Sequence, residues 1–394
     1  MTHKILIVAT IAGTIEDFLL TFVRHFRQQG WQIDGMALEI SSNPACVAQM
    51  DSVWDVRWSR NPLDPQNLAV AVPRIQEIVA KGNYDLVHVH TPVAAFVTRY
   101  AIEQLKMKHK PVVVYTAHGF HFHQQGNPIT NQIFLTLEKI AGKWTDYLIT
   151  INREDEAAAK KHRLLPESRI FYTPGIGLDL NVYDPQQVTQ SEIAGIYQEL
   201  GLTTENILLL TVAEFTPNKR HRDQLLALKQ LNRPQVHLAF AGEGSNRLKL
   251  EQLTHKLGLE DRVHFLGFRR DIPALICAST ALLLTSAREG LPRSIMEAFC
   301  AATPVIGTKI RGISDLLADE CGLLVDVGDI NALAEAMATI IDCPEKTAKM
   351  GENGRRKIAA YDVERIIQLY ADIYERALSK DEQTWNPSPN RVSI

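Results

Sequence analysis

The chain has 394 residues, of which 45% are hydrophobic and 22% are charged, and its formal net charge is −3. This length favours two globular domains, and the near-neutral charge excludes a general electrostatic attraction to nucleic acid. The five cysteines are scattered and form no Cys-x-x-Cys pair, which favours a reducing, cytoplasmic compartment and argues against a zinc site. We expect no secretory signal, because acidic residues follow the short apolar run at 5–12. We also expect no membrane-spanning helix, since no run of about 18 apolar residues occurs.

The first half of the chain alternates continuous apolar runs with helical patterns. Such runs are typical of parallel strands that helices bury on both faces. A loop is expected at 11–14, after the first strand, and then a helix from about 17 to 29 that Gly30 ends. The expected strands of this half lie at 4–10, 31–38, 84–90, 111–116 and 146–151.

The pattern pauses at 172–187, which is rich in Gly, Pro and Asp, and then restarts as a second unit of the same kind. Its expected strands lie at 206–213, 236–241, 263–266, 281–285, 303–308 and 322–325, and helices are expected at 221–231, 247–257 and 366–378. We therefore predict an α/β protein with two doubly wound, Rossmann-like domains facing a cleft. The expected divisions are a first domain at 1–175, a linker at 176–205, a second domain at 206–362, a helix at 363–380 that packs back on the first domain, and a disordered tail at 381–394.

The segment after the expected strand at 281–285 carries the strongest functional signal, because ligands of open α/β sheets bind beyond the carboxyl ends of the strands. Pro292 suits the first position of a helix over about 292–301. The first N–H groups of that helix lack internal partners and carry the positive end of its dipole. A diphosphate is therefore expected there, beside Arg293 and Ser294.

Two carboxylates flank this expected helix start. Glu289 lies before the helix, and Glu297 lies just over one turn into it. An ionised carboxylate accepts two hydrogen bonds, which suits the paired hydroxyls of a ribose at Glu297 and a sugar ring at Glu289. By itself, the Glu-x7-Glu spacing is also satisfied by a plain strand–loop–helix turn with two solvated glutamates.

The sequence EGLPRSIMEAF resembles the Glu-x7-Glu motif of the family 4 retaining glycosyltransferases, which have the GT-B fold. The resemblance extends along the chain to about residue 378. It implies an N-terminal acceptor-binding domain and a C-terminal nucleotide-sugar-binding domain. It also implies that Glu289 lies by the donor sugar and that Glu297 binds the ribose. The turn at Gly290, Leu291 and Pro292 would contact sugar and phosphate.

A cation for the donor diphosphate is expected in the loop after the strand at 206–213. Family members often show a Gly-Arg pair here and a Lys five residues after the Arg. This sequence keeps the Lys, as Lys219, but has Glu214 in place of the Arg. Arg220 or Arg293 would have to supply the missing charge. The plain alternative is that Lys219 is a surface lysine at the start of a helix.

Three further loops are expected near the donor. Gly242 belongs to a Gly-x-Gly turn, but Arg247 breaks the dinucleotide fingerprint, so a structural turn and a donor contact both stay open. Phe268 and Arg269 lie in the loop that holds the nucleobase in the family. Gly13 follows the first strand, where the resemblance implies an approach to phosphate or acceptor.

Histidines gather after the expected strand at 111–116. His118 matches the family's Thr-x-His-Gly position, so the resemblance implies a hydrogen bond to the donor sugar or the acceptor. His121 and His123 are weaker candidates for acceptor contacts, and His88 and His90 share one strand face nearby. No acidic cluster joins these histidines, and the family transfers sugars without metal. We therefore expect neither a metal nor another cofactor.

Two basic clusters, at 106–110 and 160–163, lie in the first half of the chain. Charge runs are usually solvated faces, but neighbouring apolar residues would let these clusters dock peripherally on anionic lipid at the inner membrane face. The apolar residues are Phe120, Phe122, Ile133 and Phe134.

These signals predict an enzyme that moves a hexose or N-acetylhexosamine from a UDP-sugar to a lipid-linked or glycan acceptor in cell-surface polysaccharide biosynthesis. The segments TAHGFHF and DYLITIN most resemble bacterial transferases that extend lipid-linked glycans, which favours an undecaprenyl-diphosphate acceptor. The expected catalytic residues are His118, Glu289 and Lys219. A nucleotide-sugar epimerase on the same fold is one alternative. A non-catalytic nucleotide-sugar-binding protein is the other, and Glu214 is its best support.

Overall fold

In the computed structural model, which describes residues 2–59, 61, 64–123 and 126–379, the chain forms two compact units. Unit 1 comprises the residues before Leu178 together with the helix that begins at Val363, and unit 2 is Leu178–Asp362. Unit 2 is therefore inserted between two segments of unit 1. The tail expected at 381–394 lies outside the described residues.

Unit 1 is built on a seven-stranded parallel sheet. Its strands are β1 Lys4–Ile11, β2 Gln32–Leu38, β3 Ser52–Asp55, β4 Leu86–His90, β5 Val112–Ala117, β6 Tyr147–Thr150 and β7 Ile170–Tyr172. They lie in the order β3-β2-β1-β4-β5-β6-β7. The five expected strands are confirmed. The two additional strands, β3 and β7, are the edges of the sheet and are only four and three residues long, too short to show a hydrophobic period.

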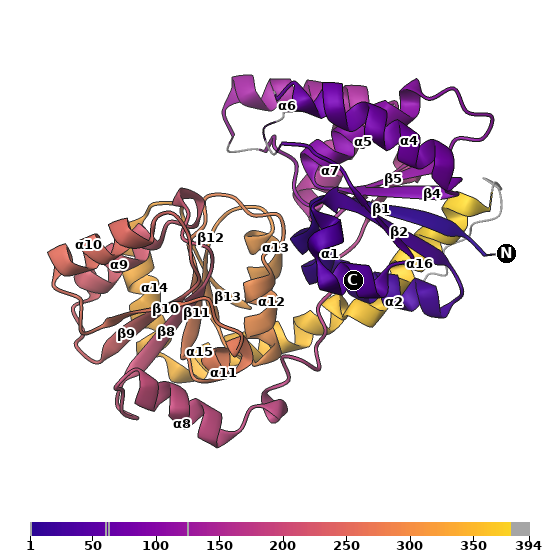
Figure 1. The fold of residues 1–394 in the computed structure, drawn as a ribbon. Coiled ribbons are helices and arrows are strands. Elements are labelled where there is room, and N and C mark those ends of the chain that lie inside the picture. Colours follow the sequence, from indigo (N-terminus) through magenta and orange to yellow (C-terminus); the bar gives the residue numbers. More distant parts are fainter. Residues whose placement is uncertain (1, 60, 62–63, 124–125, 380–394) are drawn as a thin grey trace. The chain divides into compact units, whose positions relative to one another are not determined.

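Helices cover both faces of this sheet (Figure 1). They are α1 Ala12–Phe18, α2 Leu20–Gln28, α3 Pro44–Gln49, α4 Val72–Gly82, α5 Pro92–Gln104, α6 Pro128–Gly142, α7 Arg153–Lys161 and α16 Val363–Leu378, with short helical turns η1 Ile40–Ser42, η2 Asn67–Ala71 and η3 Glu167–Arg169. One hydrophobic core joins the sheet to α4, α5 and α7, and the other joins it to α1, α2 and α16.

The start of unit 1 differs from the expected loop at 11–14. Helix α1 begins at Ala12, so Gly13 lies in the first helical turn and not in a loop. Burial of Ala12 and Ile15 in the core favours this early turn. The helix expected at 17–29 is also interrupted at Leu19, where α1 ends and α2 begins.

Helix α16 completes unit 1 from the far end of the chain. Its buried residues recur at helical spacing and form one apolar face, made of Val363, Ile366, Ile367, Tyr370, Ala371, Ile373, Tyr374 and Ala377. The Tyr370 ring packs edge-on against Phe22 at 5.0 Å between ring centroids, and Tyr374 packs against Phe26 at 5.1 Å.

Unit 2 is built on a six-stranded parallel sheet. Its strands are β8 Ile207–Val212, β9 Val236–Ala241, β10 Val263–Gly267, β11 Ala281–Leu284, β12 Val305–Thr308 and β13 Gly322–Val325. They lie in the order β10-β9-β8-β11-β12-β13, and all six agree with the strands expected from the sequence.

Helices again flank both faces of the sheet of unit 2 (Figure 1). They are α8 Gln190–Glu199, α9 His221–Leu231, α10 Arg247–Leu257, α11 Ile272–Cys277, α12 Arg293–Cys300, α13 Ile313–Leu317, α14 Ile330–Asp342 and α15 Pro344–Ile358, with short turns η4 Pro185–Gln187, η5 Pro217–Lys219 and η6 Ala359–Tyr361. One core includes α11, α12 and α13, and the other includes α9 and α14.

The interval 176–205 is not a plain linker. It contains α8, which begins with a capping box in which Thr189 and Glu192 each bind the other's backbone N–H. Ile196 of this helix is buried in a core of unit 2. The Thr-x-x-Glu pattern that starts the helix was readable in the sequence, so the linker expectation was wrong at this point.

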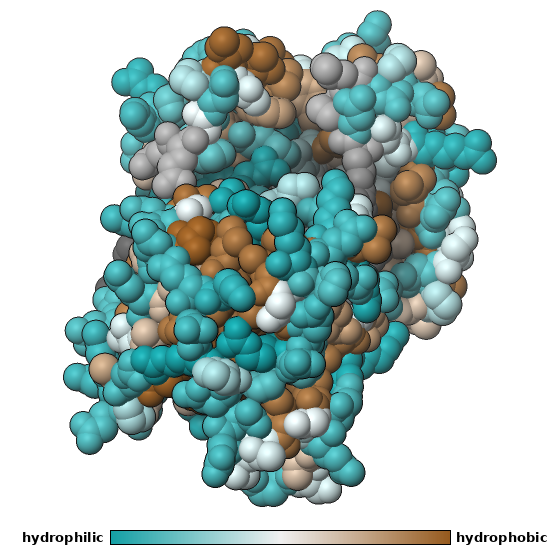
Figure 2. Space-filling model, turned by 90° about the vertical axis from the view of Figure 1, so that its left-hand side faces the viewer, coloured by the Kyte–Doolittle hydropathy of each residue, from teal (hydrophilic) through white to brown (hydrophobic). Residues whose placement is uncertain are grey.

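Among the described residues, no helix is long and apolar enough to cross a membrane. Figure 2 shows a mixed face with hydrophobic side chains at several places, one of them at the top, over α6. Three isoleucines of that helix are well exposed, namely Ile129, Ile133 and Ile140.

Replacing Ile366 by Ala tests whether α16 is part of the core of unit 1. Ile366 is fully buried, so Ile366→Ala is expected to lower the free energy of unfolding of unit 1 by about 2–5 kcal/mol. The measurement is denaturant unfolding of the full chain. The control Glu375→Ala, at an exposed position of the same helix, is expected to change the free energy of unfolding by less than about 0.5 kcal/mol. Equal effects of the two substitutions would contradict the packing of this helix.

Candidate active site

The loops that follow β8 and β11 meet in unit 2, because these two strands are neighbours at the point where the strand order reverses. Ligands of open α/β sheets bind at such a switch point. The two loops are tied together by the N–H of Ala287, which donates to the carbonyl of Asn218 at 2.8 Å. The Asn218 side chain in turn donates to the carbonyl of Arg288 at 2.9 Å.

Lys219 and Glu289, two of the expected catalytic residues, are in direct contact at this point. The Lys219 ammonium donates to Glu289 Oε1 at 2.6 Å, and the two side chains are 23% and 12% exposed. The charges are therefore partly shielded from water, which strengthens the attraction between them. Both residues still reach solvent, so an incoming anion can compete for Lys219.

A buried chain of hydrogen bonds supports the loop that carries Lys219. Thr211 of β8 donates to Gln224 at 2.6 Å, Gln224 donates to Thr285 at 2.9 Å, and Thr285 donates to the carbonyl of Lys219 at 3.2 Å. Thr211, Gln224 and Thr285 are almost completely buried. Because a satisfied buried network is rigid, it fixes the backbone of Lys219 relative to the end of β11.

The segment after β12 contacts the backbone of the loop that carries Glu289. We did not predict this contact from the sequence. The buried Arg311 donates from Nε to the carbonyl of Glu289 at 3.2 Å. Gly312 has a φ of +74°, and a Cβ atom there would lie 2.0 Å from the carbonyl oxygen of Gly290. The pair Arg311-Gly312, three residues after the end of the buried strand β12, was the available signal.

Helix α12 begins one residue later than expected. Pro292 is extended, with φ −75° and ψ 118°, so it precedes the helix, and Arg293 is the first helical residue. Arg293 and Ser294 nevertheless lie in the first turn, as predicted. The helix buries the face that carries Ile295, Met296 and Phe299.

Glu297 is held inside unit 2 by two partners. The hydroxyl of Tyr183 donates to Glu297 Oε1 at 2.8 Å, and Arg293 Nε lies 3.0 Å from the same oxygen. Burial raises the pKa of Glu297, and the contacts with Tyr183 and Arg293 oppose that rise. Tyr183 lies in the interval expected to be a linker and was missed for that reason.

Both candidate replacements for the cation that Glu214 removes are already paired. Arg220 is paired with Asp223 at 2.5 Å, and Arg293 is paired with Glu297. Each of the two candidate replacements thus already neutralises a carboxylate of unit 2. Glu214 itself is exposed.

The glycines of the Gly-x-Gly turn have a clear packing role. Gly242 has a φ of +154°, and a Cβ atom there would lie 2.1 Å from the carbonyl oxygen of Ala213. At Gly244 it would lie 2.6 Å from the carbonyl oxygen of Phe215. These glycines are required because the turn packs directly on the backbone of the Lys219 loop.

In the loop after β10, the candidate residue Phe268 is exposed, whereas Arg269 is bound to carboxylates of unit 2. Phe268 is 68% exposed, and the Arg270 guanidinium lies 5.6 Å from its ring. Arg269 donates to Asp271 and to Glu199 of α8, and these hydrogen bonds raise the pKa of Arg269. The guanidinium therefore serves an ion-pair network, whereas contact of this loop with a nucleobase stays a prediction.

In unit 1, His118 lies within a group of three histidines. His118 Nε2 is 3.0 Å from His90 Nδ1, and the His90 and His88 rings are 4.0 Å apart. His88 bonds to Tyr374 of α16 at 2.5 Å and to Thr116 at 2.8 Å. The chain of contacts thus runs from α16 to the residue just after β5.

Burial keeps these histidines neutral. Desolvation lowers the pKa of His88 to about 3 and that of His118 to about 4, and it lowers the pKa of His90 well below its usual value. Within the described ranges, no three His, Cys, Asp or Glu side chains are placed to hold a metal ion.

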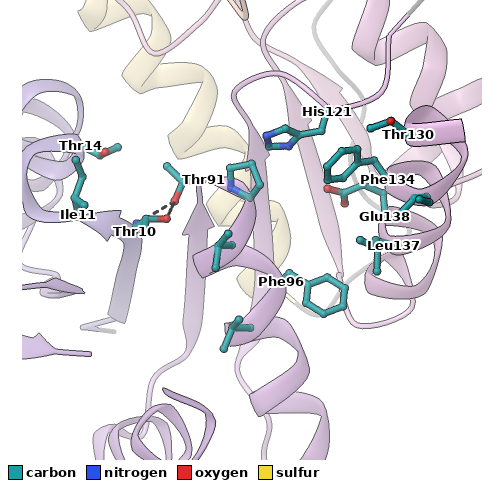
Figure 3. A pocket seen from close by; sticks show the side chains of 14 residues that line it. Thr10, Ile11, Thr14, Thr91, Phe96, His121, Thr130, Phe134, Leu137 and Glu138 are labelled. Atoms are coloured by element: carbon teal, nitrogen blue, oxygen red, sulfur yellow. Dashed lines mark hydrogen bonds between the residues drawn. The ribbon is translucent and has the colours of Figure 1, made fainter. Parts of the chain in front are cut away.

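A cavity of about 630 Å³ opens in unit 1 where β1 and β4 end. This is the switch point of the unit 1 sheet, where β1 and β4 are neighbours. Figure 3 shows the end of β1 on one side and α6 on the other, with the start of α5 between them. Of the residues singled out from the sequence, His121, Ile133 and Phe134 line this cavity, whereas Gly13 does not.

The aromatic residues expected to dock on lipid divide into two pairs. Phe120 and Phe122 are 1% and 6% exposed and stack on each other inside the core, so they cannot reach a membrane. Ile133 is 56% exposed, and Phe134 lines the cavity. The docking prediction was therefore wrong for Phe120 and Phe122.

Known proteins match the chain along most of its length. A family model described as Glycosyltransferase Family 4 matches residues 15–175, and one described as Glycosyl transferases group 1 matches residues 195–357. EpsD of Bacillus subtilis (strain 168), which is named as a glycosyltransferase, is 34% identical over 385 residues, covering 97% of this chain and 98% of EpsD. The chain belongs to the family 4 glycosyltransferases. The prediction that it is a transferase enzyme is thereby confirmed.

Other relatives agree with this family 4 transferase in sequence and fold. An Escherichia coli protein named UDP-Gal:alpha-D-GlcNAc-diphosphoundecaprenol alpha-1,3-galactosyltransferase is 28% identical over 309 residues, 76% of this chain and 77% of that protein. Anabaena HepE in complex with UDP-glucose is 24% identical with a TM-score of 0.78, covering 95% of this chain and 99% of HepE. Sucrose-phosphate synthase from Thermosynechococcus elongatus is 20% identical with a TM-score of 0.78, covering 96% and 100%. The transferase has the GT-B fold, as predicted.

The buried histidines make the stability of the transferase depend on pH. The unfolded chain binds protons on them below about pH 6.5, whereas the folded chain does not until much lower pH, so stability is full above that pH and falls as the pH drops toward 4. His88→Gln is expected to lower the slope of unfolding free energy against pH by about 1.4 kcal/mol per pH unit in this window. Denaturant unfolding from pH 7 to pH 4 measures it.

The exposed control His109→Gln is expected to leave that slope unchanged. A slope that is the same in His88→Gln and in the wild type would contradict a neutral, buried His88.

Proposed function

We propose that this transferase moves a hexose or N-acetylhexosamine from a UDP-sugar to a lipid-linked or glycan acceptor, with retention of the anomeric configuration, in cell-surface polysaccharide biosynthesis. The observation that carries the proposal is the contact between Lys219 and Glu289 at the switch point of unit 2, next to the start of α12. This arrangement offers a cation, helix N–H groups and a carboxylate at one edge of the sheet.

We assign the donor to unit 2 because its charged side chains and helix N–H groups suit a nucleoside diphosphate sugar. Lys219 and the first N–H groups of α12, near Arg293 and Ser294, suit a diphosphate. Glu297, buried one turn further along α12, suits the ribose hydroxyls, and Glu289 suits the sugar. Solved complexes of Anabaena HepE with UDP and with UDP-glucose support UDP as the nucleotide.

The chemistry follows from where charge develops. The bond between the sugar anomeric carbon and the diphosphate oxygen breaks, a bond from the acceptor oxygen to that carbon forms on the same face, and the acceptor proton passes to the leaving diphosphate. Lys219 and the α12 N-terminus stabilise the growing negative charge of the diphosphate. The neutral imidazole of His118 hydrogen-bonds the sugar or the acceptor.

A lipid-linked acceptor is proposed from two considerations. The Escherichia coli relative is named for an acceptor that carries a diphosphoundecaprenol. Exposed Ile129, Ile133 and Ile140 on α6 would give unit 1 an apolar contact with a membrane at which such an acceptor resides. We therefore propose a cytoplasmic enzyme that docks peripherally on the inner membrane face.

Donor hydrolysis and transfer test the proposal directly. The purified full chain is incubated with UDP-glucose, UDP-galactose or UDP-N-acetylglucosamine and an undecaprenyl-diphosphate-linked sugar in detergent. UDP release should require the acceptor, and mass spectrometry should find an acceptor that is one sugar heavier. Transfer to soluble sugars alone would refute the lipid-linked acceptor, and a new UDP-sugar formed without acceptor would indicate an epimerase.

Removing the Lys219 charge tests the donor site. Lys219→Met is expected to lower kcat/KM about 100- to 1,000-fold, because one preorganised charge that faces a developing anion contributes that much. Lys229→Met, an exposed lysine on α9, is the matched control and should keep wild-type activity. Full activity of Lys219→Met would exclude this assignment, and UDP binding without any turnover in the wild type would favour a non-catalytic binder.

Metal removal tests the expected independence from cofactors. After dialysis against EDTA, the transferase is expected to keep its full rate, because Lys219 and the α12 N-terminus supply the charge that a divalent ion would otherwise provide. The measurement is UDP release with and without added Mg²⁺ or Mn²⁺. A rate that falls on EDTA treatment and returns with either ion would overturn the expectation.

A further inference from the structure

The cavity in unit 1 is walled mainly by apolar side chains from two helices. Phe96 and Val93 come from α5, and Ile133, Phe134 and Leu137 come from α6. In Figure 3, Phe134 and Leu137 project from α6 toward the space between the helices, and Phe96 lies across from them. The cavity volume is about 630 Å³.

Several polar groups in the wall already bond to the protein. The Thr91 hydroxyl donates to the carbonyl of His90, accepts from the N–H of Thr10 at 2.9 Å, and lies 2.7 Å from the Thr10 hydroxyl. Thr91 has a φ of +61°, which is rare for a β-branched residue, so these bonds hold a strained backbone in place. The two hydroxyls are thus engaged with each other and are poor partners for a sugar.

The carboxylate of Glu138, which lines the cavity, is engaged as well. Glu138 accepts from Arg99 at 3.4 Å and from the Tyr115 hydroxyl at 3.3 Å. Arg99 is 1% exposed and lies 4.1 Å from the Tyr115 ring, so its charge is buried beneath the cavity and is matched by Glu138. Because a buried charge needs its partner, Glu138 stays committed to Arg99.

A cavity of this kind suits a hydrocarbon better than a sugar or a diphosphate. No Lys or Arg is among its lining residues in the described part of the chain, and its carboxylate would repel an anion. An apolar protein cavity of about 150 Å³ holds one benzene molecule, and this cavity is about four times larger. It therefore has room for several isoprene units.

An apolar path leads from the cavity along α6. Ile133 lines the cavity and is also 56% exposed, while Ile129 and Ile140 are 73% and 40% exposed. Residues separated by four and eleven positions fall on the same side of a helix, so these three form one stripe. A chain too long for the cavity can continue over these exposed isoleucines of α6.

We propose that this cavity binds the isoprenoid part of the acceptor, taking the isoprene units nearest the diphosphate between α5 and α6. The inference rests on the proposed lipid-linked acceptor. It implies that the enzyme recognises the lipid itself as well as the sugar that the lipid carries. The energy comes from removing the hydrocarbon from water, since each buried methylene contributes about 0.8 kcal/mol.

Water-soluble acceptors of different chain length separate this cavity from membrane docking. N-acetylglucosaminyl diphosphates that carry a methyl, a geranyl or a farnesyl group are compared without detergent or membrane. The wild type is expected to show a KM at least about tenfold lower for farnesyl than for methyl. A KM independent of the chain would overturn the inference and leave the proposed function intact. Transfer to none of these acceptors, nor to the undecaprenyl one, would refute the lipid-linked acceptor of the proposed function and this inference with it.

Two substitutions then locate the binding site. Leu137→Asn places an amide in the apolar wall and should reduce the farnesyl-to-methyl KM ratio to near one. Ile133→Trp, at a half-exposed position where the fold tolerates a larger ring, narrows the cavity and should shrink the ratio in the same way. Leu248→Asn, at an exposed leucine of unit 2, is the matched control and should keep the wild-type ratio. A wild-type ratio in Ile133→Trp and in a folded Leu137→Asn would place the isoprenoid elsewhere and overturn the inference.

Discussion

The contact between Lys219 and Glu289 depends on one topological constraint, the adjacency of β8 and β11. The two residues are separated by 70 positions in the chain, yet their charged atoms are 2.6 Å apart. Parallel strands place their carboxyl ends at the same edge of the sheet, so neighbouring strands deliver their following loops to one place. The same constraint acts in unit 1, where Thr10 at the carboxyl end of β1 and Thr91 directly after β4 are 81 positions apart and share hydrogen bonds. Each unit thus has its own candidate site at its own switch point.

Local electrostatics distinguish the two sites. In unit 2, Lys219, Glu289 and Arg293 are charged groups in partial contact with water and Glu297 is buried beside Arg293, which suits a donor that is itself charged. In unit 1 the charged pair of Arg99 and Glu138 is turned inward, and His88 of β4 and His118 just after β5 are held neutral by burial. The polar groups of unit 2 and the apolar cavity of unit 1 therefore match the two chemically different ends of the transfer to a lipid carrier that we propose.

The sheets were predictable from the sequence because continuous apolar runs can be satisfied only by burial on both faces. The motif around Glu289 and Glu297 was predictable too, since a strand, Pro292 and the first turn of α12 are all local features. Arg311 and Tyr183 were not, because they reach their partners Glu289 and Glu297 across 22 and 114 positions. Gly13 shows that the boundary of an element is hard to predict from sequence. The burial of Ala12 and Ile15 favours a helix where a loop was expected. The apolar cavity was hidden for a similar reason, since its wall combines α5 and α6 with the end of β1.

Helix α16 belongs to unit 1 but is synthesised after unit 2, and this order has a physical consequence. The core formed by Phe22, Phe26 and the sheet of unit 1 is closed by Tyr370 and Tyr374, which the ribosome adds only after the whole of unit 2. During translation unit 2 can fold as soon as Asp362 has emerged, whereas unit 1 waits with one face of its sheet uncovered. A message truncated shortly before codon 363 would therefore yield a complete unit 2 joined to an incomplete unit 1, and such a product would present aromatic surface to chaperones and proteases.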